Sequence, residues 1–359
     1  MKVIDKISLK NFKCYSSMEF DLRNLNVLTG INSSGKSTLI QSLLLLRQSY
    51  DLNRIQNGLL LNSNLIDLGT AQDIVSTNLI GEEPIIEINL SFDGDEMSNK
   101  CSVRPSESDF LKTENHPLVP EGLNLFSNGF NYISSNRIGP QKVYEKSYSM
   151  VSNSRSVGIY GELFAHMYQL NKRDDNNNTI LGDTLENDFA RWMSEISPGF
   201  SIDTFSDSAS QTVELSFKKT GDSKSYKPVN VGFGLSYIAP VLVSLLMSNE
   251  GDLIIVESPE AHLHPKGQRK MGELLARISA KGVQIITETH SDHIVNGVRL
   301  AVKKGDISTD SVKFMYFYRD EKEHKVDYIN VKEDGQLSHW PDGFFDEWDN
   351  ALFELLRKS

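Results

Sequence analysis

The sequence predicts an α/β fold in which a mostly parallel sheet is covered by helices on both faces. Short apolar runs typical of buried strands lie at residues 252–257, 283–287 and 312–318. Helical patterns alternate with these runs, at residues 236–247, 267–279 and 292–303. Strands that alternate with helices favour a parallel sheet, because each parallel connection has to cross from one end of the sheet to the other.

Composition and charge narrow the class of protein. Of the 359 residues, 39% are hydrophobic and 24% are charged, which is typical of a globular protein with a large core. No apolar run approaches the ~20 residues that cross a bilayer, so we expect a cytoplasmic protein with no membrane contact. Two cysteines, Cys14 and Cys101, cannot make a disulfide framework. The formal net charge of −11 opposes non-specific nucleic-acid binding, so any DNA contact would need a local basic patch or a partner.

The elements divide the chain into three parts. The first 30 residues are rich in β-forming patterns and predict an antiparallel β-subdomain, and a Leu-rich run without Gly or Pro predicts a helix at 36–49. Residues 84–92 alternate as a half-buried strand does. The pattern then weakens, with expected helices at 158–170 and 184–196 and a strand at 212–218. We therefore expect residues 1–92 and 231–359 to form the two halves of one core, with 93–230 as an inserted α+β lobe.

A phosphate-binding loop is the strongest motif. Residues 30–37 read Gly-Ile-Asn-Ser-Ser-Gly-Lys-Ser, which fits G-x-x-x-x-G-K-[ST] between a predicted strand and a predicted helix. Glycines let the backbone N–H groups surround a phosphate, and the helix N-terminus adds the positive end of its dipole. Lys36 is expected to reach the β- and γ-phosphate oxygens, and the Ser37 hydroxyl to bind Mg²⁺. The loop predicts a nucleoside triphosphate as ligand.

Three later segments indicate the class of nucleotide-binding protein. In residues 253–265, LIIVESPEAHLHP, a predicted buried strand is followed by carboxylate side chains. Carboxylates at a strand end beside a phosphate loop can hold Mg²⁺. Residues 285–293, IITETHSDH, are another buried strand, followed by His290. Residues 230–240, NVGFGLSYIAP, form a glycine-punctuated turn before an apolar helix.

Together with the start ISLKNFKCYSSMEFDLRNLNVLTGINSSGKSTLIQSLLLL, these segments resemble the ATPase heads of the ABC class, in its RecF, SMC and OLD-like branch. The resemblance covers residues 1–80 and 228–300, and it is to small stand-alone bacterial AAA-family members without a coiled coil, many of which serve in phage defence. It implies a P-loop fold and an ATPase that uses ATP and Mg²⁺. It also implies a homodimer, or a higher even-numbered oligomer, that holds ATP between two copies and controls a separate effector, possibly a nuclease.

The resemblance also implies roles for individual residues. The nucleotide would be bound by Asn32, Ser33, Ser34, Gly35, Lys36, Ser37 and Thr38, and from the second copy by Gly232 and Gly234 of the signature loop. Mg²⁺ would be held by Ser37, Gln72 and Glu257. Gln72 rests on its position alone, and a surface glutamine is as good an interpretation. His290 matches the switch histidine that senses the γ-phosphate.

Two departures from the family pattern affect catalysis. No serine stands first in the signature loop, where Asn230 or Gly232 is found. Aligned on Pro259, the usual Asp-Glu pair becomes Glu257-Ser258, and a serine hydroxyl cannot accept a proton efficiently at neutral pH. We therefore expect slow hydrolysis with Glu257 or Glu260 as general base, or ATP binding without appreciable turnover.

Other interpretations compete with this one. His262, His264, His290 and His293 could form a metal hydrolase site, but their spacing specifies no metal. Residues 171–174, Asn-Lys-Arg-Asp, match the guanine-reading N-K-x-D pattern, yet no D-x-x-G element follows the phosphate loop as a GTPase requires. A built-in nuclease lacks a D-x-D after a glutamate in strand context. Arg137 precedes a Gly-Pro turn, where a structural salt bridge is favoured over phosphate contact.

The C-terminal tail is aromatic. Trp340, Phe344, Phe345 and Trp348 precede or begin a short helix expected at 346–357. The simpler interpretation is that this tail packs on the core. The alternative is a docking surface for an effector, because aromatic side chains dominate protein interfaces.

Overall fold

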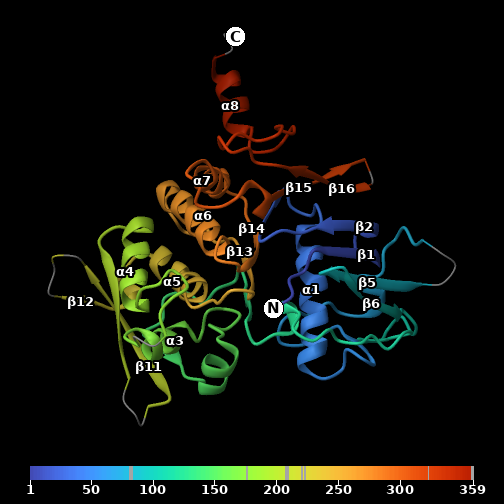
Figure 1. The fold of residues 1–359 in the computed structure, drawn as a ribbon, viewed down its shortest axis with the longest axis horizontal. Coiled ribbons are helices and arrows are strands. Elements are labelled where there is room, and N and C mark those ends of the chain that lie inside the picture. The colour runs from blue at the N-terminus through green and yellow to red at the C-terminus, as the bar shows by residue number, and fades with distance from the viewer. Residues whose placement is uncertain are drawn as a thin grey trace.

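The computed structural model describes residues 1–80, 84–174, 177–206, 210–219, 221, 224–321 and 323–356, with the side chains of 348–350 left out. A central sheet and its helices form the middle of the molecule, an antiparallel β-subdomain lies on one side and a lobe on the other (Figure 1). Within the described residues, no helix combines the length and the apolar character needed to cross a bilayer.

The central sheet has six strands in the order β16-β15-β3-β14-β13-β8. Their bounds are β3 Leu25–Gly30, β8 Phe130–Ile133, β13 Leu253–Glu257, β14 Gln284–Glu288, β15 Val312–Asp320 and β16 Glu323–Ile329. Neighbours pair in parallel except β15 with β16. The predicted α/β fold with a mostly parallel sheet is confirmed.

Both faces of this sheet are buried, because successive strand residues point to opposite sides. Val27 belongs to one hydrophobic cluster and Leu28 to the other. The helices of the first face are α5 Phe233–Leu246, α6 Pro265–Ser279 and α7 Asp292–Lys303. Helix α1, Lys36–Asp51, covers the second face.

A four-stranded antiparallel sheet closes the α1 side, in the order β2-β1-β5-β6. Its strands are β1 Lys6–Phe12, β2 Tyr15–Asp21, β5 Ile85–Phe92 and β6 Asp95–Ser102. Next to it lie β4 Gly58–Leu60, β7 Phe110–Lys112 and the short helix α2 Ala71–Ile74. The N-terminal antiparallel β-subdomain is therefore as expected, and it includes one strand beyond residue 92.

The inserted lobe starts later than the expected residue 93. Strand β6 completes the antiparallel β-subdomain, and β8 pairs with β13 in the central sheet. The first part of the expected lobe, residues 93–133, therefore contributes strands to these two sheets. The lobe itself contains β9 Val143–Glu145, α3 Phe164–Asn171, α4 Leu185–Ile196, β10 Phe200–Phe205, β11 Thr212–Lys219 and β12 Ser225–Tyr226. β6 forms a hairpin with β5, whereas β8 pairs with β13, a strand more than a hundred residues further along the chain, and local sequence pattern does not reveal that pairing.

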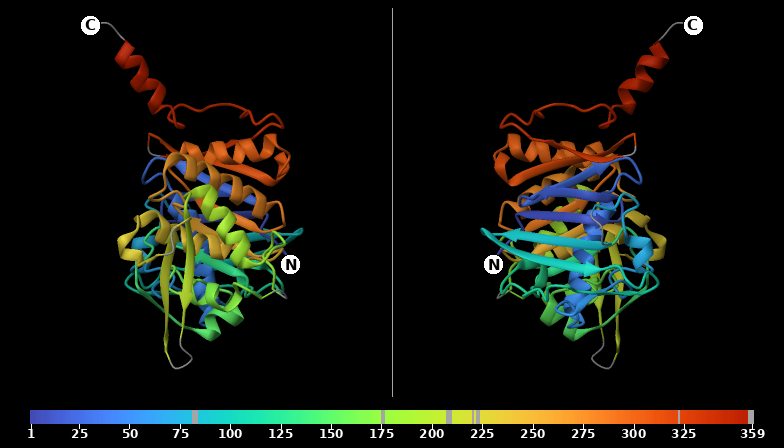
Figure 2. Two further views of the ribbon diagram at one scale, coloured as in Figure 1. Left: turned by 90° about the vertical axis from the view of Figure 1, so that its left-hand side faces the viewer. Right: turned by 90° about the vertical axis from the view of Figure 1, so that its right-hand side faces the viewer.

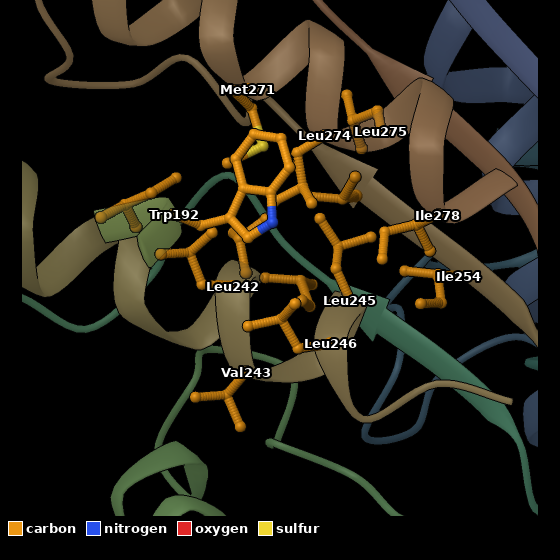
Figure 3. Packing of buried hydrophobic residues seen from close by; sticks show 14 of the residues in the cluster. Trp192, Leu242, Val243, Leu245, Leu246, Ile254, Met271, Leu274, Leu275 and Ile278 are labelled. Atoms are coloured by element: carbon orange, nitrogen blue, oxygen red, sulfur yellow. The ribbon is translucent and has the colours of Figure 1, made fainter. Parts of the chain in front are cut away.

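The lobe joins the core through an apolar contact. Trp192 of α4 lies among side chains of α5 and α6, including Leu242, Leu245, Met271 and Leu274 (Figure 3). These helices share one hydrophobic cluster with the central sheet, so lobe and core are packed as one body.

The C-terminal arm differs from the favoured interpretation. Phe344 is buried and packs edge-to-face on Tyr316 of β15, so the base of the arm is part of the core. Helix α8, Glu347–Leu356, instead projects from the body (Figure 2), with Phe353 72% and Leu355 83% exposed. The expected end of this helix at residue 357 and the side chain of Trp348 lie outside the described residues.

Candidate functional site

The phosphate loop connects β3 to α1 as predicted. Gly35 is the N-cap of α1 with φ 107°, a conformation that side chains rarely adopt, and a Cβ there would lie 2.1 Å from the Tyr15 hydroxyl oxygen. At the other end of the loop, a Cβ on Gly30 would lie 2.0 Å from the Phe317 carbonyl oxygen. Both glycines of the motif are therefore required by close approach of the chain.

Lys36 is folded into the loop. Its side chain is 3% exposed, and Nζ donates to the carbonyl oxygens of Gly30 at 2.9 Å and Ile31 at 2.8 Å. Oε1 of Glu288 lies 3.6 Å from Nζ. Burial lowers the pKa of Lys36, and Glu288 opposes that shift. The lysine thus faces a carboxylate at the place where its motif binds phosphate.

The other loop residues differ in accessibility. Asn32, Ser33 and Ser37 are exposed, whereas the buried Ser34 donates its hydroxyl to the Ile31 carbonyl at 2.7 Å. The Thr38 hydroxyl accepts from the Cys14 thiol at 3.4 Å. The exposed main chain and the free approach to Ser37 suit a phosphate and its metal, because the loop's N–H groups need an acceptor.

The ends of three parallel strands bring the acidic residues together. β14 lies between β3 and β13, and the register pairs Glu288 with Leu28 on one side and with Glu257 on the other. Oε2 of Glu257 accepts a hydrogen bond from the Ser135 amide at 3.1 Å. The Ser258 amide still donates to the Glu288 carbonyl of β14 at 2.8 Å, and the φ of 44° at Ser258 then turns the chain away from β13.

Glu260 and His290 are neighbours in the structure. The His290 amide donates to Oε1 of Glu260 at 2.9 Å, while Oε2 of Glu260 is buried without a partner among the described residues. The His290 ring is about half exposed, and its Nε2 lies 3.9 Å from Oε1 of Glu288. Burial and then the charge of Lys36 lower the pKa of His290, which favours the neutral ring.

Glu288 is the acidic residue that the sequence analysis missed. Burial raises its pKa and the charge of Lys36 lowers it, while Glu257 and Glu260 raise it further. A signal was available, because IITE ends a buried strand in a carboxylate just as LIIVE does.

His324 was also missed. Its Nδ1 lies 3.1 Å from the Ser34 carbonyl oxygen, and its ring packs edge-to-face on Tyr15. His324 belongs to β16, so the C-terminal part of the chain contacts the phosphate loop directly. No local pattern identifies such a contact between residues 290 positions apart.

Oxygen ligands for Mg²⁺ are present near the carboxyl ends of the central strands. The Ser37 hydroxyl, the Glu257 carboxylate and Oε2 of Glu260, which has no partner in the described part of the chain, are hard oxygen donors, which Mg²⁺ prefers. The residues therefore fit the metal that the motif implies. Gln72 lies exposed in α2, and its main-chain N–H donates to the Ser106 carbonyl at 3.0 Å. The role of its side chain stays a prediction.

The glycine turn before α5 lies at the surface. Gly232 is the N-cap of α5 with open space around it, and Phe233 beside it is more than half exposed. Gly234 is different, because a Cβ there would lie 2.5 Å from the His262 carbonyl oxygen. The turn therefore presents Gly232 to solvent and packs Gly234 on the loop after β13.

The competing interpretations gain no support. Within the described residues, no group of three or more His, Cys, Asp or Glu side chains converges on a metal position. His262 packs on Tyr237, and His264 caps α6 by accepting from the Lys266 amide. Lys172 of the N-K-x-D match donates to Thr204 within the lobe. Arg137 makes hydrogen bonds to main-chain carbonyls rather than the favoured salt bridge.

The architecture is that of the ATPase heads of SMC proteins. The crystal structure of an SMC head bound to the C-terminal winged-helix domain of ScpA matches with a TM-score of 0.56 and 15% identity, over 92% of this chain and 98% of that one. An SMC head with an extended coiled coil, bound to the C-terminal domain of ScpA from Pyrococcus furiosus, matches with a TM-score of 0.55 and 13% identity. That match covers 99% of this chain and 100% of the other. The P-loop, ABC-type head fold is thereby confirmed.

Sequence comparison gives the family. The family model described as "AAA domain, putative AbiEii toxin, Type IV TA system" matches residues 25–296, more than half of the chain. The chain belongs to this AAA-domain family. A second family model, of a protein of unknown function (DUF3696), matches residues 307–355. No curated protein matches the chain.

Proposed function

We propose that the protein binds ATP with Mg²⁺ at the phosphate loop and hydrolyses it slowly. The single observation that carries the proposal is the position of Lys36 at the ends of β3 and β14, where its Nζ donates to the Gly30 carbonyl and lies 3.6 Å from Oε1 of Glu288. Glu257 ends the next strand in register with Glu288. A cation, a helix N-terminus and metal-binding carboxylates at one sheet edge are the parts that phosphoryl transfer uses.

Each residue has a role in this proposal. Ser37, Gln72 and Glu257 would hold Mg²⁺, which when bound neutralises charge on the phosphates. Glu257 or Glu260 accepts a proton from the attacking water, and His290 contacts the γ-phosphate. Turnover is slow because Ser258 occupies the position of the usual general base and cannot replace a carboxylate at neutral pH.

ATP also joins two copies of the chain in this proposal. Gly232 and Phe233 at the start of α5 are exposed, so a γ-phosphate bound by the loop of a second copy could approach the N-terminus of this helix. Each copy would give the same surface, which is the geometry of a closed two-fold dimer. Higher even-numbered assemblies are compatible with this contact.

The dimer would act on a separate effector, possibly a nuclease, in bacterial antiviral defence or DNA maintenance. The family description names a putative toxin of a toxin–antitoxin system, and the SMC heads bind a domain of ScpA. By analogy we assign this protein a protein partner rather than direct DNA contact, because its net charge is −11. The exposed apolar side chains of α8 are available for such a contact.

A second function, an ATP-binding scaffold without appreciable hydrolysis, is favoured by one observation. Ser258 has φ 44° and its carbonyl is bound by Arg137, so the turn holds a serine where the base is expected. Measurement of turnover separates the two functions. An ATPase-coupled nuclease is third, because no nuclease motif follows the head.

The test is phosphate release by the purified protein, with and without DNA. We expect slow release that Glu257→Gln reduces by at least ~10²-fold with ATP binding retained, as for loss of a general base. Lys36→Ala should weaken ATP binding by about 10- to 100-fold, the value of a hydrogen bond to a charged group. Release by wild type that neither variant changes would contradict the proposed site, and ATP binding without release would favour the scaffold.

A further inference from the structure

Arg137 is a buried cation with an unusual set of partners. Its side chain is 2% exposed, and burial lowers its pKa to about 10. Instead of a carboxylate it binds three carbonyl oxygens: NH1 donates to Ser134 at 3.1 Å and to Glu257 at 2.8 Å, and NH2 donates to Ser258 at 2.6 Å. Burying a guanidinium without a carboxylate partner is unfavourable, because desolvation of a cation is costly. Its three carbonyl contacts therefore need an explanation.

The carbonyls it binds flank the residue proposed to act on ATP. Ser258 has φ 44°, so the chain leaves β13 abruptly, and the carbonyls of Glu257 and Ser258 both face the guanidinium. The planar fork of an arginine suits two successive acceptors, which an ammonium group does not match. Oε2 of Glu257 accepts from the Ser135 amide, only two residues before Arg137. Main chain and carboxylate of Glu257 are thus held from one short segment.

The same guanidinium touches the helix that follows the glycine turn. Its central carbon lies 5.5 Å from the centre of the Tyr237 ring in α5. Tyr237 in turn packs edge-to-face on His262 with ring centres 4.5 Å apart. The main chain of α5 also approaches the His262 carbonyl closely at Gly234. The start of α5 and the loop after β13 are therefore packed on each other, with Arg137 at their junction.

We propose that Arg137 is a positioning residue that couples the exposed glycine turn at Gly232 to the carboxylate of Glu257. The inference rests on the proposed function, in which Gly232 contacts the nucleotide of a second copy. A shift of α5 on contact with that nucleotide reaches Arg137 through the Tyr237 ring. Through the two carbonyls it then reaches Glu257, so that hydrolysis depends on the second copy.

Arg137→Lys is the most informative variant, because it keeps the positive charge and most of the side-chain volume but removes the planar guanidinium that binds two carbonyls. We expect kcat for ATP to fall at least tenfold, while the affinity for ATP and the thermal midpoint stay close to wild type. Arg155→Lys is the matched control, since Arg155 pairs with Asp252 at the opposite end of β13 and should leave kcat unchanged. Millimolar guanidinium should restore part of the activity of Arg137→Ala.

A second pair of variants tests the same coupling in case Arg137→Lys fails to fold. Tyr237→Phe keeps the ring and should retain kcat, whereas Tyr237→Leu removes it and should lower kcat with ATP affinity unchanged. Wild-type kcat in both Arg137→Lys and Tyr237→Leu would overturn this inference alone, as would a parallel loss of kcat, affinity and thermal stability. A wild-type protein without ATP turnover would overturn both this inference and the hydrolysis proposed above.

Discussion

Lys36 and Glu288 form a pair that any incoming nucleotide has to separate. The ammonium group is 3.6 Å from the carboxylate, and both side chains are largely buried. Phosphate oxygens carry the same sign of charge as Glu288, so they compete with it for Lys36. The carboxylate also lies near Glu257 and Glu260, whose charges raise its pKa after the larger effect of burial. We therefore expect Glu288 to affect how readily the phosphate loop accepts a nucleotide.

Glu288→Gln should tighten the binding of ATP measured without Mg²⁺ by roughly 3- to 10-fold, or about 1 kcal/mol. The substitution keeps the shape of the side chain and removes the competing charge. The raised pKa gives the sign of the pH dependence: as pH falls, Glu288 becomes protonated in the wild type and resembles glutamine. The difference between the two proteins should shrink at lower pH in calorimetric titrations. Equal affinities at pH 8 would contradict this account.

At the scale of elements, the C-terminal arm has a packed base and a free helix. Phe344 is 1% exposed and contacts Tyr316, Trp340 and Phe345, whereas Phe353 of α8 is 72% exposed. The two residues are of one type and lie nine positions apart in the chain. They allow a matched comparison of base and helix.

Phe344→Ala should lower the free energy of unfolding by about 3–5 kcal/mol, because it removes a buried ring and leaves a cavity. Phe353→Ala should change it by less than about 0.5 kcal/mol, as for an exposed side chain. Thermal and denaturant unfolding of both variants measure the difference. If Phe353→Ala destabilised the isolated protein as much as Phe344→Ala, helix α8 would have to pack on the body.

Local sequence patterns predicted most elements of the core. The loop at 30–37 and the strands at 253–257 and 284–288 were predictable, because a buried parallel strand is a continuous apolar run and the loop needs its glycines. Strand β8 was not, since it has four residues and its place at the sheet edge depends on pairing with β13. The carbonyl contacts of Arg137 were also beyond reach, because they depend on the path of the chain after Glu257.

At the scale of the whole molecule, the phosphate loop and the exposed glycine turn are two halves of the proposed site. Lys36 begins α1 on one face of the central sheet, and Gly232 begins α5 on the other. Gly232 can be tested cleanly, since a side chain there meets open space and aspartate is a favourable N-cap residue. Gly234 cannot, because any side chain would collide with the His262 carbonyl.

The central claim is that each nucleotide is bound by two copies of the chain, and mixing two inactive variants tests it most directly. On this account, Lys36→Ala damages only the phosphate loop, and Gly232→Asp would place a carboxylate against the γ-phosphate only from the opposite copy. Each variant alone should release little phosphate. An equimolar mixture should recover about a quarter of wild-type turnover, because half of the dimers are mixed and each mixed dimer has one intact site of two. Full activity of Gly232→Asp alone, or no recovery on mixing, would contradict the account.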